Sequence, residues 1–157
     1  QVDKYTWVDI GSSWIMSEIS AGILFSQLER SEEIYEKRSI IYSHYEQELK
    51  TWGEENDVRL PAVPNYCEHT AHLFHLRFSR GELRTEFIEF LAERGVNAVF
   101  HYQALNLSRM GKFYGGKLGQ CPVAEDAGET LVRLPLFSSM SGIQLDQILD
   151  AVLGFSC

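Results

Sequence analysis

The segment "TAHLFHLRF" (residues 70–78) alternates apolar and polar side chains, as a half-buried β-strand does. The next segment, 79–95, has helical spacing and ends in a glycine. Two more short strand patterns occupy 97–102 and 130–137, and Ser141 is placed to cap a final helix. This order predicts an α+β layer, a small sheet with flanking helices.

Residues 17–52, upstream of this layer, carry a long helical pattern. Its apolar side chains recur at helical spacing: Ile19, Ile23, Leu24, Leu28, Ile34, Tyr35, Ile41, Tyr42, Tyr45 and Leu49. We expect Gly53 to end the helix as a left-handed stop. At 1.5 Å per residue such a helix is about 54 Å long, which suits an element bridging two parts of a bigger protein. With irregular residues 1–16 before it and the α/β layer at 57–157, we take the whole of 1–157 as one domain.

Composition excludes several classes of protein. The 157 residues are 45% hydrophobic and 12% aromatic, which fits a globular chain rather than a disordered one. Fourteen basic and 22 acidic residues give a net charge of −8, which argues against a broad surface for nucleic acid or anionic membrane. Three scattered cysteines and the absence of a long apolar run predict a cytoplasmic protein with free thiols. The start at Gln1, directly in patterned sequence, suggests the back part of a longer chain.

A cluster of potential metal ligands lies at Cys67, His69, His72 and His75. Soft and borderline ligands crowded in this way suggest zinc. In the predicted strand, however, His72 points to the opposite face from His69 and His75, so the set cannot close one tetrahedron. We therefore favour ordinary strand histidines and expect no metal site.

Two motif-like segments lack essential parts of the motifs they approach. "GKFYGGKL" (111–118) has the glycines and lysine of a phosphate loop, but it lacks the Ser or Thr and the preceding buried strand. "SSMSG" (138–142) lacks the glycine that a nucleophile elbow requires. We assign no catalytic residue. The glycine-rich stretch 103–128 is expected to be a long loop, a feature that is often functional.

His101 and Tyr102 form the better candidate site, because they end a predicted strand and enter that loop. An imidazole and a phenol offer donors and acceptors suited to a sugar hydroxyl or a carboxylate. The alternative is a half-buried packing pair.

The stretch Gly11-Ser12-Ser13 precedes the long helix and offers a second candidate. Hydroxyls before a helix are usually caps, but Ser17 already serves as a competent cap. Free N–H groups at turns and helix starts favour phosphates, so an anion site is the alternative.

Five segments, in order, resemble the C-terminal part of the DegT/DnrJ/EryC1/StrS sugar aminotransferases. They are "DKYTWVDIGSSW" (3–14), "QLE" (27–29), "AHLFHLRF" (71–78), "AVFHY" (98–102) and "CPVAEDAGETLVRLPLF" (121–137). The resemblance implies pyridoxal 5′-phosphate (PLP) as cofactor and the type I aminotransferase fold. Its small domain joins a long helix to a small, mainly antiparallel sheet with flanking helices. It also implies a homodimer with active sites at the subunit interface.

The family's cofactor-attaching lysine belongs to a large N-terminal domain, in a glycine-rich motif absent here. The lysines of this chain stand in other contexts: Lys4, Lys37, Lys50, Lys112 and Lys117. The resemblance therefore implies a C-terminal domain that is inactive alone and has its own large domain as partner.

The resemblance also implies roles for individual residues. Ser13 stands where relatives place a polar residue that reaches the PLP phosphate of the neighbouring subunit, with Ser12 beside it. His101 and Tyr102 match the segment that faces the nucleotide-sugar. Trp14 stands where tyrosine is expected, and we assign it to the substrate as well.

Two departures follow the His101-Tyr102 pair. Ala104 and Asn106 replace the usual proline and second histidine, and Asn106 keeps hydrogen-bonding capacity without a titratable group. We expect Asn106 also to contact the substrate. The implied reaction moves an amino group from glutamate to a 4-keto sugar nucleotide, such as a dTDP-sugar. The rivals are a stand-alone ligand-binding module and a non-catalytic sensor of the same fold.

Overall fold

The computed structural model describes residues 15–157, which fall into two compact units that divide between Glu32 and Glu33. In the first unit, α1 (Glu18–Leu28) begins after Ser17, whose hydroxyl accepts a hydrogen bond from the Ser20 N–H at 3.2 Å. Ser17 is thus the cap that the sequence predicts. No residue of α1 is buried. Within residues 15–157, no helix is both long and apolar enough to cross a membrane.

The prediction of one helix over 17–52 is wrong, because a tight turn separates α1 from α2 (Ser31–Glu55). The Arg30 N–H donates to the Gln27 carbonyl at 3.1 Å, three residues back rather than four, so the end of α1 tightens. Ser31 and the two glutamates after it are residue types that favour a new helix N-terminus. Apolar spacing continues across the turn, so periodicity alone does not reveal it.

The end of α2 also differs from the expectation. Gly53, predicted as a left-handed stop, lies inside α2 and is buried. A Cβ at Gly53 would lie 2.5 Å from Leu60 Cδ1 and 2.8 Å from the Val58 carbonyl oxygen, so glycine is needed there for close packing. The left-handed backbone conformation expected at Gly53 is found instead at Asp57, beyond the end of the helix, where φ is 52°.

Three short strands form the sheet: β1 (Phe74–Arg77), β2 (Val99–Phe100) and β3 (Leu131–Leu134). Their order is β1-β3-β2, and central β3 pairs antiparallel with both neighbours. The small antiparallel sheet is confirmed, although each strand is shorter than its sequence pattern. Ala71, within the predicted strand 70–78, has φ 47°, which is incompatible with extended backbone.

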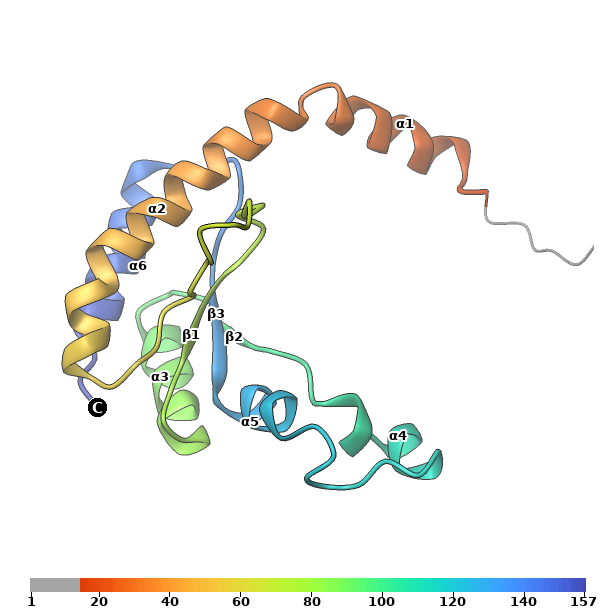
Figure 1. Ribbon diagram of the computed structural model, residues 1–157. Helices are drawn as coiled ribbons and strands as arrows, with labels where there is room; N and C mark the ends of the chain where they lie inside the picture. Colours follow the sequence, from red (N-terminus) through yellow and green to blue (C-terminus); the bar gives the residue numbers. More distant parts are fainter. Residues whose placement is uncertain (1–14) are drawn as a thin grey trace, which may run out of the picture. The chain divides into compact units, whose positions relative to one another are not determined.

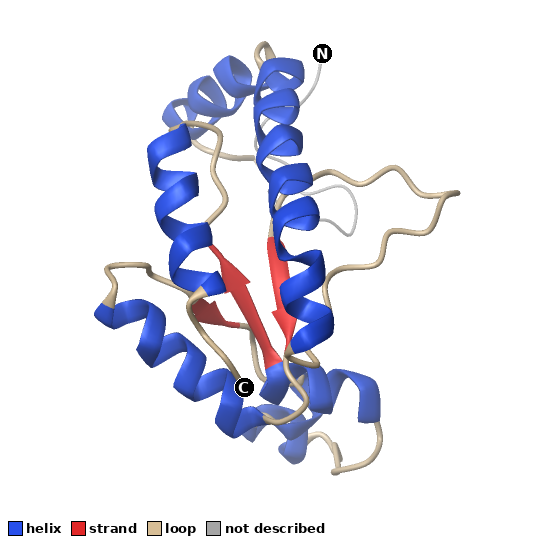
Figure 2. Cartoon of the chain, turned by 90° about the vertical axis from the view of Figure 1, so that its left-hand side faces the viewer, coloured by secondary structure: helices blue, strands red, loops and turns tan. Residues whose placement is uncertain are grey.

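The core lies between one face of the sheet and three helices, α2, α3 (Gly81–Glu93) and α6 (Gly142–Leu153), as Figures 1 and 2 show. Alternate strand residues supply the sheet side of this core: Phe74, Leu76, Val132 and Leu134. The ring centroids of Tyr45 and Phe74 lie 5.1 Å apart, and the Tyr45 hydroxyl donates to the Pro135 carbonyl at 2.8 Å. The second unit therefore carries a core of its own.

The cap predicted at Ser141 is confirmed. The Ser141 hydroxyl accepts from the Gln144 N–H at 3.3 Å, and the Gln144 side chain accepts from the Ser141 N–H at 2.9 Å. This reciprocal pair is a capping box that starts α6. Gly95, the predicted stop after α3, has φ 74° as a left-handed stop requires.

The expectation of a long irregular loop over 103–128 is wrong. The segment contains a 3₁₀ turn, η1 (Leu105–Leu107), and the helix α4 (Arg109–Phe113), and most of α5 (Pro122–Thr130) falls within it. Its glycines permit close approach as well as turns: a Cβ at Gly111 would lie 1.8 Å from the Leu105 carbonyl oxygen. Glycine there is a packing requirement rather than a sign of mobility.

The histidine-rich segment before β1 is not strand. The Tyr35 hydroxyl donates to the His69 carbonyl at 3.1 Å, and Arg38 Nε donates to the Ala71 carbonyl at 3.0 Å. His69 and His72 thus belong to an irregular segment held against α2, so the alternation argument applied to them above does not hold. The residues 15–157 contain no group of three or more His, Cys, Asp or Glu side chains arranged to hold a metal ion.

Candidate functional site

His101 and Tyr102 follow directly after β2. Their ring centroids lie 5.5 Å apart in an edge-to-face arrangement. The Tyr102 side chain is 76% exposed, whereas His101 is half-buried. Within the described part of the chain, His101 Nδ1 is buried and has no hydrogen-bond partner. A buried polar atom without a partner is costly, so this imidazole is suited to meet a further group.

A cavity of about 230 Å³ opens beside His101. Its lining comes from α3, the end of β2, the segment from there through η1, and α5: Arg84, Phe100, His101, Gln103, Ala104, Leu107, Glu125, Gly128 and Glu129. Arg84 Nε is, among residues 15–157, a second buried polar atom without a partner. The cavity therefore combines an imidazole, a guanidinium and an amide with the carboxylates of Glu125 and Glu129, a set that can hydrogen-bond hydroxyl groups.

The cavity contains no lysine, so it does not supply the group that attaches PLP. Of the described lysines, Lys37 is bonded to Glu33 at 2.6 Å, and Lys50, Lys112 and Lys117 are exposed. The residues present here fit a pocket for a substrate better than one for the cofactor itself.

Asn106 holds the segment after His101 in place. Its amide donates to the Lys117 carbonyl at 3.0 Å and to Glu125 Oε1 at 2.5 Å. Both amide hydrogens are thus engaged within the chain. Contact of Asn106 with a substrate stays a prediction, and the observed bonds give it a structural role.

Glu125 is the centre of this arrangement. Its buried carboxylate accepts the Gly119 N–H at 2.8 Å and the Cys121 N–H at 3.1 Å, besides the Asn106 amide. The backbone N–H of Gly119, then that of Cys121, lowers the pKa of Glu125 below its ordinary value. The carboxylate therefore stays ionised near neutral pH and ties α5 to the segment between η1 and α5.

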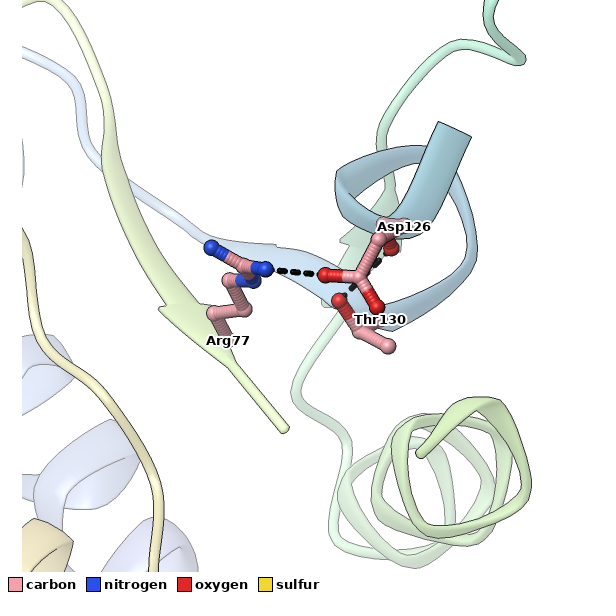
Figure 3. Close-up of polar contacts among 3 residues, drawn as sticks. All are labelled: Arg77, Asp126 and Thr130. Carbon is pink, nitrogen blue, oxygen red and sulfur yellow. Dashed lines mark hydrogen bonds and ion pairs between the residues drawn. The ribbon is translucent and has the colours of Figure 1, made fainter. Parts of the chain in front are cut away.

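The outer face of the sheet carries basic side chains. Figure 3 shows Arg77 of β1 bonded to Asp126 of α5, while the Thr130 hydroxyl donates to the Asp126 carbonyl at 2.8 Å. Arg133 of β3 donates to the Phe100 carbonyl at 3.4 Å, and its guanidinium lies 5.9 Å from the Tyr102 ring centroid. Burial lowers the pKa of the neighbouring His75, and the charge of His101 adds to the effect.

Sequence reasoning missed Arg84, Glu125 and Arg133. For Arg133 a signal existed: in "TLVRLPLF" (130–137) the alternation sets it on the face opposite Val132. Glu125 gives no such signal, because two of its partners are backbone N–H groups, those of Gly119 and Cys121, which no side-chain pattern marks, and the third, Asn106, lies 19 residues away. Ser12, Ser13 and Trp14 lie outside the described residues.

Curated relatives and solved structures cover this chain almost completely, while the chain covers only part of them. An uncharacterised protein of Methanocaldococcus jannaschii is 27% identical over 152 residues, which are 94% of this chain and 39% of that protein. The aminotransferase TlmJ of Streptoalloteichus hindustanus is 28% identical, with a TM-score of 0.74, over 86% of this chain and 35% of its own. The chain thus spans less than half the length of each.

Two further solved structures agree with these. The sugar aminotransferase Spr1654 of Streptococcus pneumoniae, solved in a PLP form, is 26% identical with a TM-score of 0.77, over 87% of this chain and 35% of that one. DesV of S. venezuelae is 24% identical with a TM-score of 0.85, over 96% of this chain and 39% of that one. At this identity the likeness supports the fold. A family model matches residues 1–153. The chain belongs to the DegT/DnrJ/EryC1/StrS aminotransferase family, a family of PLP-dependent sugar aminotransferases.

Proposed function

We propose that this chain is the C-terminal domain of a PLP-dependent nucleotide-sugar aminotransferase. The observation that carries the proposal is the cavity beside His101, in a chain that matches the family over residues 1–153. The full enzyme would move an amino group from glutamate to a 4-keto-6-deoxy sugar nucleotide. We infer this substrate from a resemblance to the transaminases acting on dTDP-4-oxo-6-deoxy-D-glucose, enzymes of surface-polysaccharide synthesis such as that of enterobacterial common antigen. We place the reaction in the cytoplasm.

PLP, when bound, supplies the electron sink for the amino transfer. The work of this chain is to bind and orient the sugar. His101, with Nδ1 unpartnered among residues 15–157, and exposed Tyr102 would hydrogen-bond sugar hydroxyls, and Trp14 would flank them. Asn106, through Glu125, would keep the wall of the pocket in place.

The chain alone would be inactive, because the described lysines lie outside the cavity. The lysine that attaches PLP would come from a large N-terminal domain of the same protein. In the homodimer, Ser13, with Ser12 beside it, would reach the phosphate of the partner's cofactor.

The experiment that tests the proposal is to sequence the gene upstream of the Gln1 codon. An in-frame segment with a lysine beside a glycine-rich turn supports the aminotransferase, and mass spectrometry would then detect the amino sugar formed from glutamate and the keto sugar nucleotide. An open frame in which that lysine is replaced favours the non-catalytic sensor. A start codon directly before Gln1 favours the stand-alone binding module.

The change Ser13→Ala tests the cofactor role in that longer enzyme. We expect weaker PLP retention, seen as loss of cofactor absorbance on dialysis, with little change in thermal unfolding. Ser43→Ala, an exposed serine on α2, is the control. Unchanged PLP affinity in Ser13→Ala would remove Ser13 from the cofactor site.

A further inference from the structure

A small cavity lies where the segment after α2, the end of β1 and α5 meet. Its volume is about 200 Å³, and its lining is mostly charged or polar: Asp57, Arg59, Arg77, Phe78, Ser79 and Asp126. None of these residues lines the cavity beside His101. Pockets for drug-sized ligands measure about 300–1,000 Å³, so this cavity suits a smaller molecule.

The backbone sets the two arginines of this cavity opposite each other. The Arg59 N–H donates to the Arg77 carbonyl at 2.9 Å, and the Arg77 N–H donates to the Arg59 carbonyl at 2.9 Å, so the two residues form an antiparallel bridge. Side chains directly opposite in such a bridge lie on one face, and like charges there destabilise the pairing. Each guanidinium is therefore favoured by an anion of its own.

Within residues 15–157 only one of these arginines has such an anion. Arg77 is paired with Asp126 of α5 (Figure 3). No hydrogen bond or ion pair there engages the side chain of Arg59 or that of Asp57. The charges that line the cavity are thus equal in number, but one cation and one anion do not close onto each other. A ligand between them can complete both.

The two open charges define the ligand. A simple anion would bring its charge near Asp57, and a simple cation would bring its charge near Arg59. A molecule that carries a carboxylate and an ammonium on neighbouring atoms avoids both repulsions. A guanidinium matches a carboxylate with a planar fork of N–H donors, a carboxylate accepts from an ammonium, and the exposed Ser79 hydroxyl can donate as well.

We propose that this cavity binds the zwitterionic head of a free α-amino acid, with its carboxylate on Arg59 and its ammonium on Asp57. The site is additional to the proposed function and does not depend on it. Binding requires no turnover and no other domain, because the second unit has a core of its own.

The test is an NMR titration of the 157-residue chain with glycine, the smallest α-amino acid. We expect saturable shifts in the backbone amides of residues 57–59 and 77–79 and little change elsewhere. Acetate, which has the carboxylate alone, and methylamine, which has the ammonium alone, are titrated at the same ionic strength. Because each lacks one of the two contacts, each should bind at least about fivefold more weakly than glycine.

Two variants remove one contact each. Arg59→Gln and Asp57→Asn should each weaken glycine binding at least about fivefold. Asparagine tolerates the left-handed conformation of Asp57, φ 52°, so the second change removes the charge and leaves the backbone in place. Arg109→Gln on α4 and Asp146→Asn on α6, both at exposed positions, are the matched controls and should bind like the wild type.

The proposal is overturned by any of four results. These are no saturable shift with glycine, shifts confined to other parts of the chain, acetate or methylamine binding as tightly as glycine, and equal weakening in the two variants and their controls. A dispersed amide spectrum of each variant shows that a loss of binding is not a loss of folding.

Discussion

Gly111 illustrates how a single atom constrains the segment beside the candidate site. A Cβ there would lie 1.8 Å from the Leu105 carbonyl oxygen, so η1 and α4 can pack only if this position lacks a side chain. The Gly116 N–H, which donates to the Gly111 carbonyl at 2.8 Å, depends on the same packing. Local structure near the cavity therefore rests on glycine.

We predict that Gly111→Ala loosens this segment. Overpacking costs about 1–3 kcal/mol, which corresponds to roughly a 5- to 150-fold faster amide exchange at Gly116 if the opening is local. Hydrogen exchange followed by NMR measures it. Gly142→Ala, where an added Cβ meets nothing within 4 Å, should leave exchange at Gly116 unchanged. Equal exchange in the two variants would contradict the packing argument.

At the scale of elements, α6 depends on its first turn. Ser141 and Gln144 bond reciprocally there, and the helix then buries Leu145, Ile148 and Val152 against the core. Because α6 supplies a wall of that core, weakening its start should lower the stability of the whole second unit rather than fray one end.

We predict that Ser141→Ala lowers the free energy of unfolding by about 1 kcal/mol. For a chain of this size the loss corresponds to a fall of about 2–4 °C in Tm. Urea and thermal unfolding followed by circular dichroism measure both. Ser139→Ala, at an exposed serine just before the helix, is the control. A fall of similar size in the control would show that the cap is not its cause.

At the scale of the whole molecule, acid should destabilise the second unit in two stages. The pKa of His75 is lowered by burial, so the folded state favours the neutral imidazole and stability is lost as the pH falls below its ordinary value, 6.5. The pKa of Glu125 is lowered by the Gly119 and Cys121 N–H groups, so its contribution is present above its ordinary value, 4.5, and is lost as the pH falls through the lowered pKa. As the pH falls, protonation reduces the net charge of −8, and the weaker repulsion between like charges stabilises the folded state, which opposes both losses.

A comparison of the wild type with His75→Gln isolates the first stage. Glutamine has no proton to gain, so we predict that the wild type loses more Tm than the variant between pH 7.5 and pH 5.5, on the order of a few degrees. Thermal unfolding across this range measures the difference. His44→Gln, at an exposed histidine of α2, should follow the wild type. Parallel curves for wild type and His75→Gln would contradict the assignment.

The sequence by itself determined the features of local structure that depend only on residues close together in the chain. Alternation located the three strands, hydroxyl spacing located the Ser141 cap, and Gly95 marked the end of α3. An ordered set of short segments indicated the family. These signals are readable because strand alternation, caps and left-handed stops are each decided within a few residues.

Only the tertiary structure decided which distant groups meet. It placed His75 opposite Arg133, tied Asn106 to Glu125, and put Gly53 and Gly111 against carbonyl oxygens where the sequence predicted a helix stop and a long loop. Register, close backbone approach and burial are set by how whole elements pack, because the free energy of each contact depends on everything that holds its two sides in place. No local pattern carries that information.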